Sequence, residues 1–531
     1  MMAGTFRTQC RQEVATMAST RHEVQSPFPA RSPNAMQRLL SGRLTGLAVG
    51  TALAAGWGLL SGWMMPRGPL TTGEALATMT VSLVIGIAAG ASMGSRWAML
   101  VAPVVSVIVF EAARLGAEGP TVDAVQSSTY GIFAFIVGRG FHALLALTPM
   151  ILGAAVGAGH MRRSEPSTPR RRAKLWRGIR RSLAAVVGLA LVALAVLIAR
   201  PASTSPIMGP DGNPAAGSIT ELTTVEAGGK DLGLMLRGTS TRNPVLLFLA
   251  GGPGGSELGA MRNHLPALEE TFLVATLDQR GTGTSYPALD PTSTLSLESY
   301  VKDTLSVTNY LRERFDQDRI YLMGQSGGTL HGILAVQRNP DFYRAFVGVG
   351  QMVSPLETDR IFYQDTLDWA NRTGKAELAG KLEDIGPPPY ESMLDYETAL
   401  SHEYEVYSYD RTGNSEGEGG FSENFLVPEY TFTDQVHLLG AFMDTFAVLY
   451  PQLQDLDFRN DAISLEVPVF FVQGAHEARG RAEPFREWVA VLEAPGKEVV
   501  EFENSGHRPL FEEPAKFVAF MRDTVLTGTA S

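Results

Sequence analysis

The sequence has a single cysteine among its 531 residues, Cys10. One cysteine cannot form a disulfide within the chain, and it cannot build a metal cluster held by several thiolates. Cysteine pairs therefore give no indication of the cellular compartment. The stretch around it, RTQCRQE, lacks the apolar run of a signal sequence, so lipoprotein processing is not indicated.

Basic residues are scarce in the second part of the chain. Residues 201–531 contain 24 Lys and Arg against 48 Asp and Glu, whereas residues 1–200 contain 20 against 7. The net charge of −11 therefore hides a basic first part and a strongly acidic second part. An acidic domain of this kind repels a phosphate backbone, so we expect no nucleic-acid partner.

Long stretches of the first 200 residues lack charge altogether. Residues 44–65 have no charged side chain over 22 positions, and residues 182–199 have none over 18. A membrane span needs about 20 mainly apolar residues, so both segments predict transmembrane helices. Three further apolar segments complete a predicted all-α transmembrane region of about five helices within residues 39–200, and they lie at 75–94, 97–110 and 140–159.

Basic residues beside these spans predict their orientation. Residues 160–181 hold nine Lys and Arg and one Glu, and residues 1–43 hold six Arg and two Glu. Such segments stay on the cytoplasmic side of a membrane. Five spans then place the N-terminus in the cytoplasm and everything after residue 200 outside it, in a multi-pass protein of the cell membrane. We interpret Arg139 and His142 as residues of the outer interface, and a buried polar pair serving transport is the alternative.

Composition divides the chain further. Residues 1–38 are rich in Ser, Arg and Pro without periodicity, so we expect a disordered cytoplasmic tail. Residues 201–216 form a Pro/Gly/Ser-rich linker. After the linker, apolar runs of strand length alternate with amphipathic helical segments, which predicts an α/β domain with a parallel sheet covered on both faces. We place the core of this domain at 217–354 and 464–531.

The stretch RIYLMGQSGGTLHG, residues 319–332, is the first candidate for chemistry. It contains Gly-x-Ser-x-Gly between a buried strand and a helix that starts at Gly327, the pattern of a nucleophile elbow with Ser326 as the nucleophile. A glycine-rich turn without chemistry is the alternative. Active sites of parallel sheets gather at the carboxyl ends of strands, which is where this serine is expected.

An acid and a histidine follow in the order that a serine hydrolase of this kind requires. Glu477 comes three residues after the apolar strand at 467–474, and His507 lies in a loop after a further short strand. The serine needs a base for its proton, and the base needs a carboxylate to fix its tautomer. We therefore predict that Ser326, His507 and Glu477 form a catalytic triad. His476 is a rival histidine, but its place beside Glu477 cannot give the acid a separate base.

Two glycines are candidate donors of an oxyanion hole, which needs backbone N–H groups aimed at developing negative charge. Gly327 directly follows the nucleophile, and Gly252 lies in AGGPGG at 250–255, after an earlier strand. No Lys-Ser/Thr pair follows this loop, which disfavours phosphate binding. The chemistry needs no metal ion and no organic cofactor.

Together these segments resemble the proline iminopeptidase branch of the α/β-hydrolases. The resemblance rests on LLFLAGGPGG, LDQRGTGTS at 277–285, GQSGG and SGHRPLFEEP, and it covers 217–531 except most of 355–463. It implies an α/β-hydrolase sheet with an inserted helical cap, and a peptidase that removes the N-terminal residue of short peptides. Three positions depart from the usual family residues: Ala250 replaces His, Gly327 replaces Trp and Glu477 replaces Asp.

Residues 355–463 are too long for a simple connection, so they predict the helical cap. They contain 22 Asp and Glu against 6 Lys and Arg. In the family that the chain resembles, cap carboxylates hold the free α-amino group of the substrate, and a solvated acidic surface is the alternative for any single residue. Residues 413–420, GNSEGEGG, are a candidate lid edge.

The sequence thus predicts a serine hydrolase tethered to the lipid bilayer, with an outward-facing catalytic domain that acts on small peptides. A carboxylic ester hydrolase is the second hypothesis, because the same fold supports both chemistries. A non-catalytic sensor or transport-associated domain is the third. The triad pattern argues against this third hypothesis, and Arg139 keeps it open.

Overall fold

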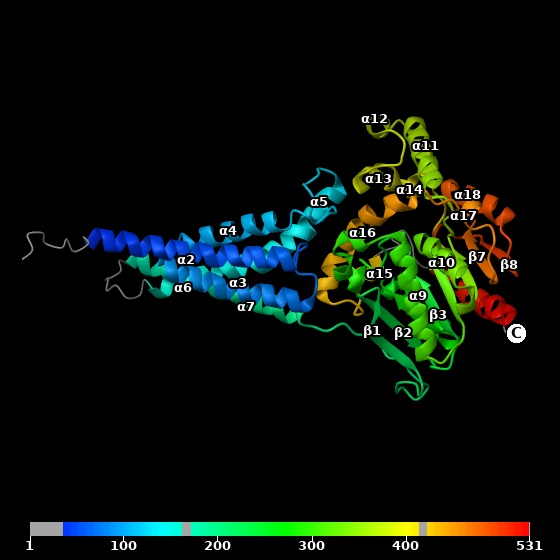
Figure 1. The fold of residues 1–531 in the computed structure, drawn as a ribbon, viewed down its shortest axis with the longest axis horizontal. Helices are drawn as coiled ribbons and strands as arrows, with labels where there is room; N and C mark the ends of the chain where they lie inside the picture. The colour runs from blue at the N-terminus through cyan, green and yellow to red at the C-terminus, as the bar shows by residue number, and fades with distance from the viewer. Residues whose placement is uncertain (1–34, 162–170, 414–421, 530–531) are drawn as a thin grey trace, which may run out of the picture.

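The computed structural model describes residues 35–161, 171–413 and 422–529 of the chain. An elongated bundle of helices leads into a globular α/β domain (Figure 1). Most of the tail predicted at 1–38 and most of the candidate lid edge at 413–420 lie outside the described residues.

The bundle is formed by helices that run side by side along its long axis (Figure 1). They are α2 (Ala35–Met64), α3 (Thr72–Met93), α4 (Ala98–Ala113), α5 (Thr129–Phe135), η1 (Ile136–Gly140), α6 (Phe141–Met161) and α7 (Arg171–Ile198). Within the described residues, four helical segments are long and apolar enough to cross a membrane, judged by length and composition. The third predicted span corresponds to α4, which has only 16 residues, fewer than the roughly 20 of a full span.

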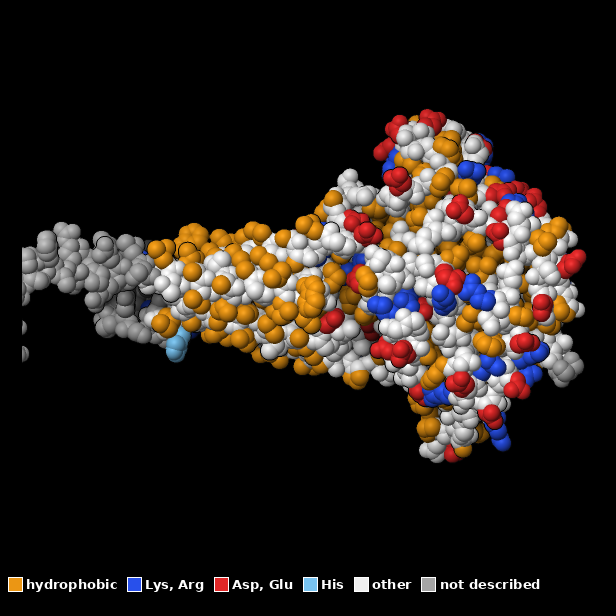
Figure 2. All heavy atoms as spheres, viewed as in Figure 1, with side chains coloured by type: hydrophobic (Ala, Val, Ile, Leu, Met, Phe, Trp, Pro, Cys, Tyr) orange, Lys and Arg blue, Asp and Glu red, His pale blue; other side chains and the backbone are white. Residues whose placement is uncertain are grey.

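Glycines allow α3 and α6 to approach closely. A β-carbon added to Gly86 would lie 2.1 Å from the carbonyl oxygen of Met150, and one added to Gly153 would lie 2.3 Å from that of Leu83. Small residues at such contacts are typical of helices that pack in lipid. The face of the bundle seen in Figure 2 carries many apolar side chains and few charges. The exposed apolar residues of the bundle include Leu44, Leu59, Trp63, Leu100, Ile108, Leu183, Leu189 and Val196.

The globular domain is built on an eight-stranded sheet with the order β1-β2-β4-β3-β5-β6-β7-β8. The strands are β1 (Ile219–Ala227), β2 (Lys230–Gly238), β3 (Val245–Leu249), β4 (Leu273–Leu277), β5 (Ile320–Gln325), β6 (Tyr343–Val349), β7 (Val469–Gly474) and β8 (Lys497–Phe502). From β4 to β8 all neighbours are parallel, as predicted. The antiparallel pair β1–β2 at the edge was not predicted; it turns at Gly228 and Gly229, whose positive φ angles suit a two-residue hairpin.

Two apolar layers cover the two faces of the sheet. Successive residues of a strand point to opposite faces, so Leu247 packs in one buried cluster with Val301 and Phe248 packs in the other with Phe517. The first layer includes α9 (Leu297–Arg314) and α10 (Gly327–Arg338), and the second includes α8 (Leu258–His264) and α20 (Pro514–Phe520). The sheet is therefore sealed on both sides, and its carboxyl edge remains for a site.

Helices occupy the long connection between β6 and β7, as predicted for a cap. They are α11 (Pro355–Thr373), α12 (Ala376–Ile385), α13 (Met393–Leu400), α14 (Glu403–Val406), α15 (Ser422–Phe425), α16 (Phe432–Leu449), η7 (Tyr450–Leu453) and α17 (Phe458–Asp461). Helix α16 lies where the bundle meets the globular domain (Figure 1).

Candidate active site

Ser326 occupies a sharp turn between β5 and α10. Its φ of 50° and ψ of −122° are unusual for a residue with a side chain and mark a strained backbone. A β-carbon on Gly328 would lie 2.3 Å from the carbonyl oxygen of Leu249, and one on Gly324 would lie 2.8 Å from that of Gly328. The glycines on either side are therefore required by the tightness of the turn, which presents the serine at the carboxyl end of the strand.

The structure brings Ser326, His507 and Glu477 into one hydrogen-bonded chain. His507 Nε2 lies 2.7 Å from Ser326 Oγ, and His507 Nδ1 lies 2.7 Å from Glu477 Oε2. The three residues follow β5, β8 and β7, so the parallel strands deliver them to the same edge of the sheet. An ionised carboxylate only accepts hydrogen bonds, so Nδ1 donates to Glu477 and Nε2 is left to accept the serine hydroxyl.

Glu477 is an anion at neutral pH although its side chain is only 2% exposed. Burial alone raises the pKa of this carboxyl group, but the nearby charges of Arg481 and His507 and their hydrogen bonds outweigh burial and lower the pKa to about 2. The carboxylate can therefore hold the imidazole in one tautomer throughout the neutral range.

Arg481 is a site residue that the sequence analysis missed. It lies on α18 (Arg479–Val491), four residues after Glu477, and its Nε donates to Glu477 Oε1 over 2.7 Å. A second nitrogen of the same side chain bonds Glu403 of the cap, and the guanidinium lies 4.9 Å from the ring centre of Phe362. Arg481 thus connects the acid of the site to the cap. The four-residue spacing from Glu477 in HEARGRAE is the feature that could have indicated the pair.

The loop that carries His507 is fixed by a carboxylate from α19 (Pro509–Glu512). The two oxygens of Glu512 accept the backbone N–H groups of Gly506 and Arg508 over 2.8 and 2.9 Å. Tyr409 of the inserted helical segment donates its hydroxyl to the same carboxylate over 2.6 Å. Both backbone neighbours of the histidine are therefore held by one side chain.

Gly252 and Gly327 lie against each other beside Ser326. A β-carbon on Gly327 would lie 2.3 Å from the carbonyl oxygen of Gly252, and one on Gly251 would lie 3.1 Å from Ser326 Cβ. Gly327 is the first residue of α10, and such an N–H group has no partner within its own helix. The close contact also gives a physical reason for the departure from Trp at position 327, since no side chain fits there in this loop conformation.

The DQRGTGTS segment, residues 278–285, packs against the glycine-rich loop at 250–255 and bonds to it. Gln279 donates its side-chain amide to the carbonyl oxygen of Ala250 over 2.9 Å, and Arg280 pairs with buried Asp303 at 2.7 Å. Burial raises the pKa of Asp278 to about 7, partly offset by hydrogen bonds from Thr284. The motif is therefore a scaffold for the glycine-rich loop at 250–255.

His476 is not part of this arrangement. Its side chain is exposed and stacks on Tyr409, with ring centres 4.4 Å apart and planes 7° from parallel. Its backbone N–H donates to the carbonyl oxygen of Ser505. Within the part of the chain that the structure describes, no group of three His, Cys, Asp or Glu residues is placed to hold a metal ion.

The strand order, the turn at the serine and the inserted helices define the α/β-hydrolase fold. Residues 244–385 match the alpha/beta hydrolase fold family, which confirms the predicted fold class. Probable aminopeptidase YbaC of Bacillus subtilis (strain 168) is 29% identical over 311 residues, covering 56% of this chain and 94% of that protein. A probable proline iminopeptidase of Leptolyngbya boryana is 24% identical over 283 residues, covering 51% of this chain and 83% of that protein. The resemblance predicted from the motifs is thereby confirmed.

Among solved structures, a proline iminopeptidase-related protein from Thermus thermophilus is 21% identical, with a TM-score of 0.41 over 59% of this chain and 98% of that chain.

Proposed function

We propose that the protein is a serine hydrolase in which Ser326 attacks an acyl carbonyl carbon. His507 Nε2 takes the hydroxyl proton as the Oγ–carbon bond forms, and it returns this proton to the leaving group as the acyl–leaving-group bond breaks. Water then gives a proton to His507 Nε2 and attacks the acyl carbon, the carbon–Oγ bond breaks to release the carboxylic acid, and the proton returns to Ser326 Oγ. Glu477 orients the imidazole, and the N–H groups of Gly252 and Gly327 bind the oxyanion. The single observation that carries this proposal is the pair of 2.7 Å contacts made by His507.

The substrate class that we propose is a short peptide, cleaved after its N-terminal residue. The names of the relatives from Bacillus subtilis and Leptolyngbya boryana support an aminopeptidase. A free α-amino group is a cation, so its recognition in a dry pocket calls for a carboxylate without a cation partner of its own.

Asp359 in the first turns of α11 is the best candidate for that carboxylate. Among the cap carboxylates that the structure describes as buried, Glu429 is paired with Arg262 and Asp444 with Arg67, whereas Asp359 is bonded by neutral Tyr450 and Gln454. Burial raises the pKa of Asp359 to about 7, partly offset by the hydrogen bonds from Tyr450 and Gln454 and by the charge of Arg481. Thr358, next to Asp359, donates its hydroxyl to the carbonyl oxygen of Gly480, next to Arg481, over 2.8 Å, so α11 brings this carboxylate toward the residue that supports Glu477.

Two measurements on the full chain test the reaction and the substrate. A fluorophosphonate probe should label Ser326, found by mass spectrometry, and Ser326→Ala should lose both labelling and turnover by several orders of magnitude. Labelling of a different serine would contradict the proposed nucleophile, and a protein that neither labels nor turns over would favour the non-catalytic sensor or transport domain.

The second measurement compares kcat/KM for an aminoacyl amide with that for its N-acetylated twin at low and high salt. Selection by a desolvated carboxylate should give about a tenfold or larger preference for the free amine, about 1.4 kcal/mol per decade, and this preference should persist at high salt. Equal values, with faster turnover of acyl esters, would favour the esterase.

We further propose that the bundle crosses the cell membrane with the hydrolase domain outside. The exposed apolar surface of the bundle (Figure 2) supports burial in lipid. The four candidate spans and the shorter α4 alternate in direction along the axis, so the start of α2 lies at the end away from the hydrolase domain (Figure 1). The basic start of α7, with Arg177, Arg180 and Arg181, lies at that end too. Arg139 donates to two backbone carbonyls of the loop before α5, at the opposite end.

A reporter that functions only outside the cytoplasm, fused after residue 531, should be active. A cytoplasmic reporter fused there should be silent. The reverse result would mean that the number of crossings is even, for example because the short helix α4 does not span the bilayer.

A further inference from the structure

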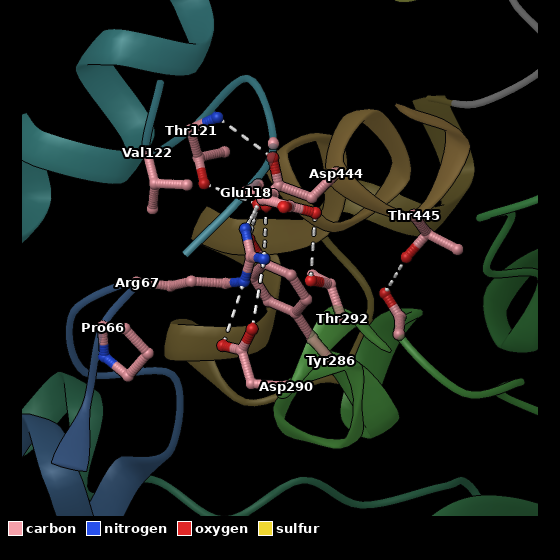
Figure 3. Close-up of polar contacts among 12 residues, drawn as sticks. Pro66, Arg67, Glu118, Thr121, Val122, Tyr286, Asp290, Thr292, Asp444 and Thr445 are labelled. Atoms are coloured by element: carbon pink, nitrogen blue, oxygen red, sulfur yellow. Dashed lines mark hydrogen bonds and ion pairs between the residues drawn. The ribbon is translucent and has the colours of Figure 1, made fainter. Parts of the chain in front are cut away.

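One arginine of the helical bundle is buried in the globular domain. Arg67 lies in the turn between α2 and α3, and its side chain is only 1% exposed. It forms an ion pair with Asp444 of α16, donates to both oxygens of Asp290 over 3.1 and 3.2 Å, and donates to the carbonyl oxygen of Glu118 over 2.6 Å. Figure 3 shows this guanidinium between the two carboxylates, which come from different parts of the hydrolase domain.

Asp444 depends on this arginine for its charge balance. Its side chain is fully buried, and its other hydrogen bonds come from neutral groups: the backbone N–H and hydroxyl of Thr121 and the hydroxyl of Tyr286. A buried carboxylate that loses its cation partner is strongly disfavoured. The position of α16 therefore depends on a residue supplied by the bundle, 377 positions away in the sequence.

The same helix contacts the glycine-rich loop at the candidate oxyanion hole by two routes. Thr445, next to Asp444, donates its hydroxyl to the carbonyl oxygen of Gly281 over 2.7 Å, in the segment whose Gln279 holds Ala250 (Figure 3). One turn earlier, the backbone of Phe442 approaches Gly254 so closely that a β-carbon there would lie 2.8 Å from its carbonyl oxygen. A displacement of α16 would thus move the loop that carries Gly252.

The bundle and the hydrolase domain are not in continuous contact. A cavity of about 1180 Å³ opens between them, lined on one side by the ends of α2 and α4 and on the other by residues 290–296 and by cap residues such as Met393 and Val448. Close packing resists displacement, whereas a hollow does not. Beside this hollow the two parts are joined by the buried ion pairs of Arg67 and by ring contacts of Phe141 with Phe432 and His437 of α16.

We propose that Arg67 is a positioning residue for catalysis. Through Asp444 and α16 the bundle sets the loop at 250–255, so the bundle is part of the working enzyme as well as an anchor. This inference rests on the proposed serine hydrolase activity. It implies that the globular domain cut away from the bundle has an unpaired buried carboxylate on α16 and a misplaced loop.

The test uses the full chain in detergent micelles. It compares Arg67→Met, Asp444→Asn and the variant that carries both substitutions, and Arg237→Met is the control. The control breaks another buried ion pair, Arg237–Glu269, whose arginine lies on β2, in the hairpin at the edge of the sheet (2.6 Å, 7% and 6% exposed). Loss of one oxyanion donor lowers kcat by about 10²–10³, so a shifted donor in Arg67→Met should lower kcat by at least about tenfold, with KM changed by less than about threefold. The rate of fluorophosphonate labelling should fall in parallel.

Because Arg67 acts through Asp444, the double variant should be no slower than the slower single variant, a non-additive result. Arg237→Met should keep the wild-type kcat even where its melting temperature falls as far as that of Arg67→Met. An unchanged kcat in folded Arg67→Met, or an equal loss in Arg237→Met, would overturn the proposal. If Arg67→Met does not accumulate as folded protein, Arg67→Lys replaces it in the test, because lysine keeps the charge but not the forked geometry of the guanidinium. An unchanged kcat in Arg67→Lys would again overturn the proposal.

Failure of the underlying activity looks different. In that case the wild-type chain itself would neither turn over substrate nor label at Ser326.

Discussion

Arg481 Nε lies 2.7 Å from Glu477 Oε1, on the side of the carboxylate opposite His507. Both partners are nearly inaccessible, with side chains 8% and 2% exposed. The acid of the site is therefore held between two groups, one of which is a permanent cation. This arrangement allows a glutamate to remain ionised in a buried position.

Arg481→Met should make it harder for Glu477 to stay ionised, because it removes the cation that is hydrogen-bonded to this carboxylate. Without the arginine, burial is less opposed, and the pKa of Glu477 should rise from its value of about 2 toward or above the ordinary carboxyl range. We expect kcat to fall by about tenfold or more at neutral pH, and the loss of activity on the acid side to begin at a higher pH than in the wild type. The measurement is kcat against pH, from about pH 4 to 9.

Arg479→Met is the matched control for that experiment. Arg479 lies two residues earlier on α18, is 45% exposed and pairs with Asp365 instead. Its profile should overlay that of the wild type. An unshifted acid limb in Arg481→Met would show that Arg481 is not needed to keep Glu477 ionised.

Two substitutions of Glu477 should separate the effect of its negative charge from the effect of its side-chain length. Glu477→Gln removes the anion and offers an amide that favours the wrong imidazole tautomer, so we expect kcat to fall by about 10³–10⁴. Glu477→Asp keeps the charge but is one methylene shorter, and we expect a loss of about tenfold or less. Steady-state kinetics of the two variants, at equal folded fraction, make the comparison. Near-normal turnover by Glu477→Gln would mean that another carboxylate orients His507.

The location of the three site residues could be derived from the sequence because each follows a segment that predicts a strand, apolar before Ser326 and Glu477 and short before His507. Parallel strands end at one edge of the sheet, so Ser326, Glu477 and His507 were expected near one another. The role of Arg481 was hidden because the four-residue spacing does not show that the carboxylate is buried. Arg67 was beyond sequence reasoning, since no periodic pattern relates the turn after α2 to Asp444.

The same limit applies to the fold. The strands β3 to β7 were predicted because they are continuous apolar runs that belong to a sheet covered on both faces. Strand β1 is half-exposed along most of its length, so it lacks such a run, and the edge hairpin was missed. Its glycine pair, Gly228-Gly229, was the available indication.

Glu512→Gln should shift the position of His507 through the backbone of the two residues beside it. Its carboxylate accepts the backbone N–H groups on both sides of His507, whereas an amide has only one oxygen and would point its NH₂ group at the second N–H. We expect kcat to fall by about tenfold, KM to change little, and fluorophosphonate labelling to slow in parallel. Glu503→Gln, an exposed glutamate that pairs with Lys516 at the surface, is the control. A rise in KM at constant kcat would instead place the effect in substrate binding.

Asp359 should make stability and amine recognition depend on pH in opposite directions. Burial raises its pKa to about 7 in the folded protein, against about 3.9 for an unfolded aspartate. The folded state therefore binds this proton more tightly, so the stabilisation is complete below about pH 4 and is lost as the pH rises to 7. The full difference is about 4 kcal/mol, from three pH units at about 1.4 kcal/mol each. Relative to Asp359→Asn, the wild-type melting temperature should fall between pH 4 and 7 and then level off.

Recognition should follow the ionised form, which appears above pH 7. The KM of an aminoacyl amide should fall as the pH rises through 7, as long as the α-amino group, with a pKa near 8, stays protonated. The N-acetylated twin should show no such change, and Asp359→Asn should remove the difference between the two substrates. A pH-dependent KM that persists in Asp359→Asn would assign amine recognition to another carboxylate, while the stability difference would still report the buried proton of Asp359.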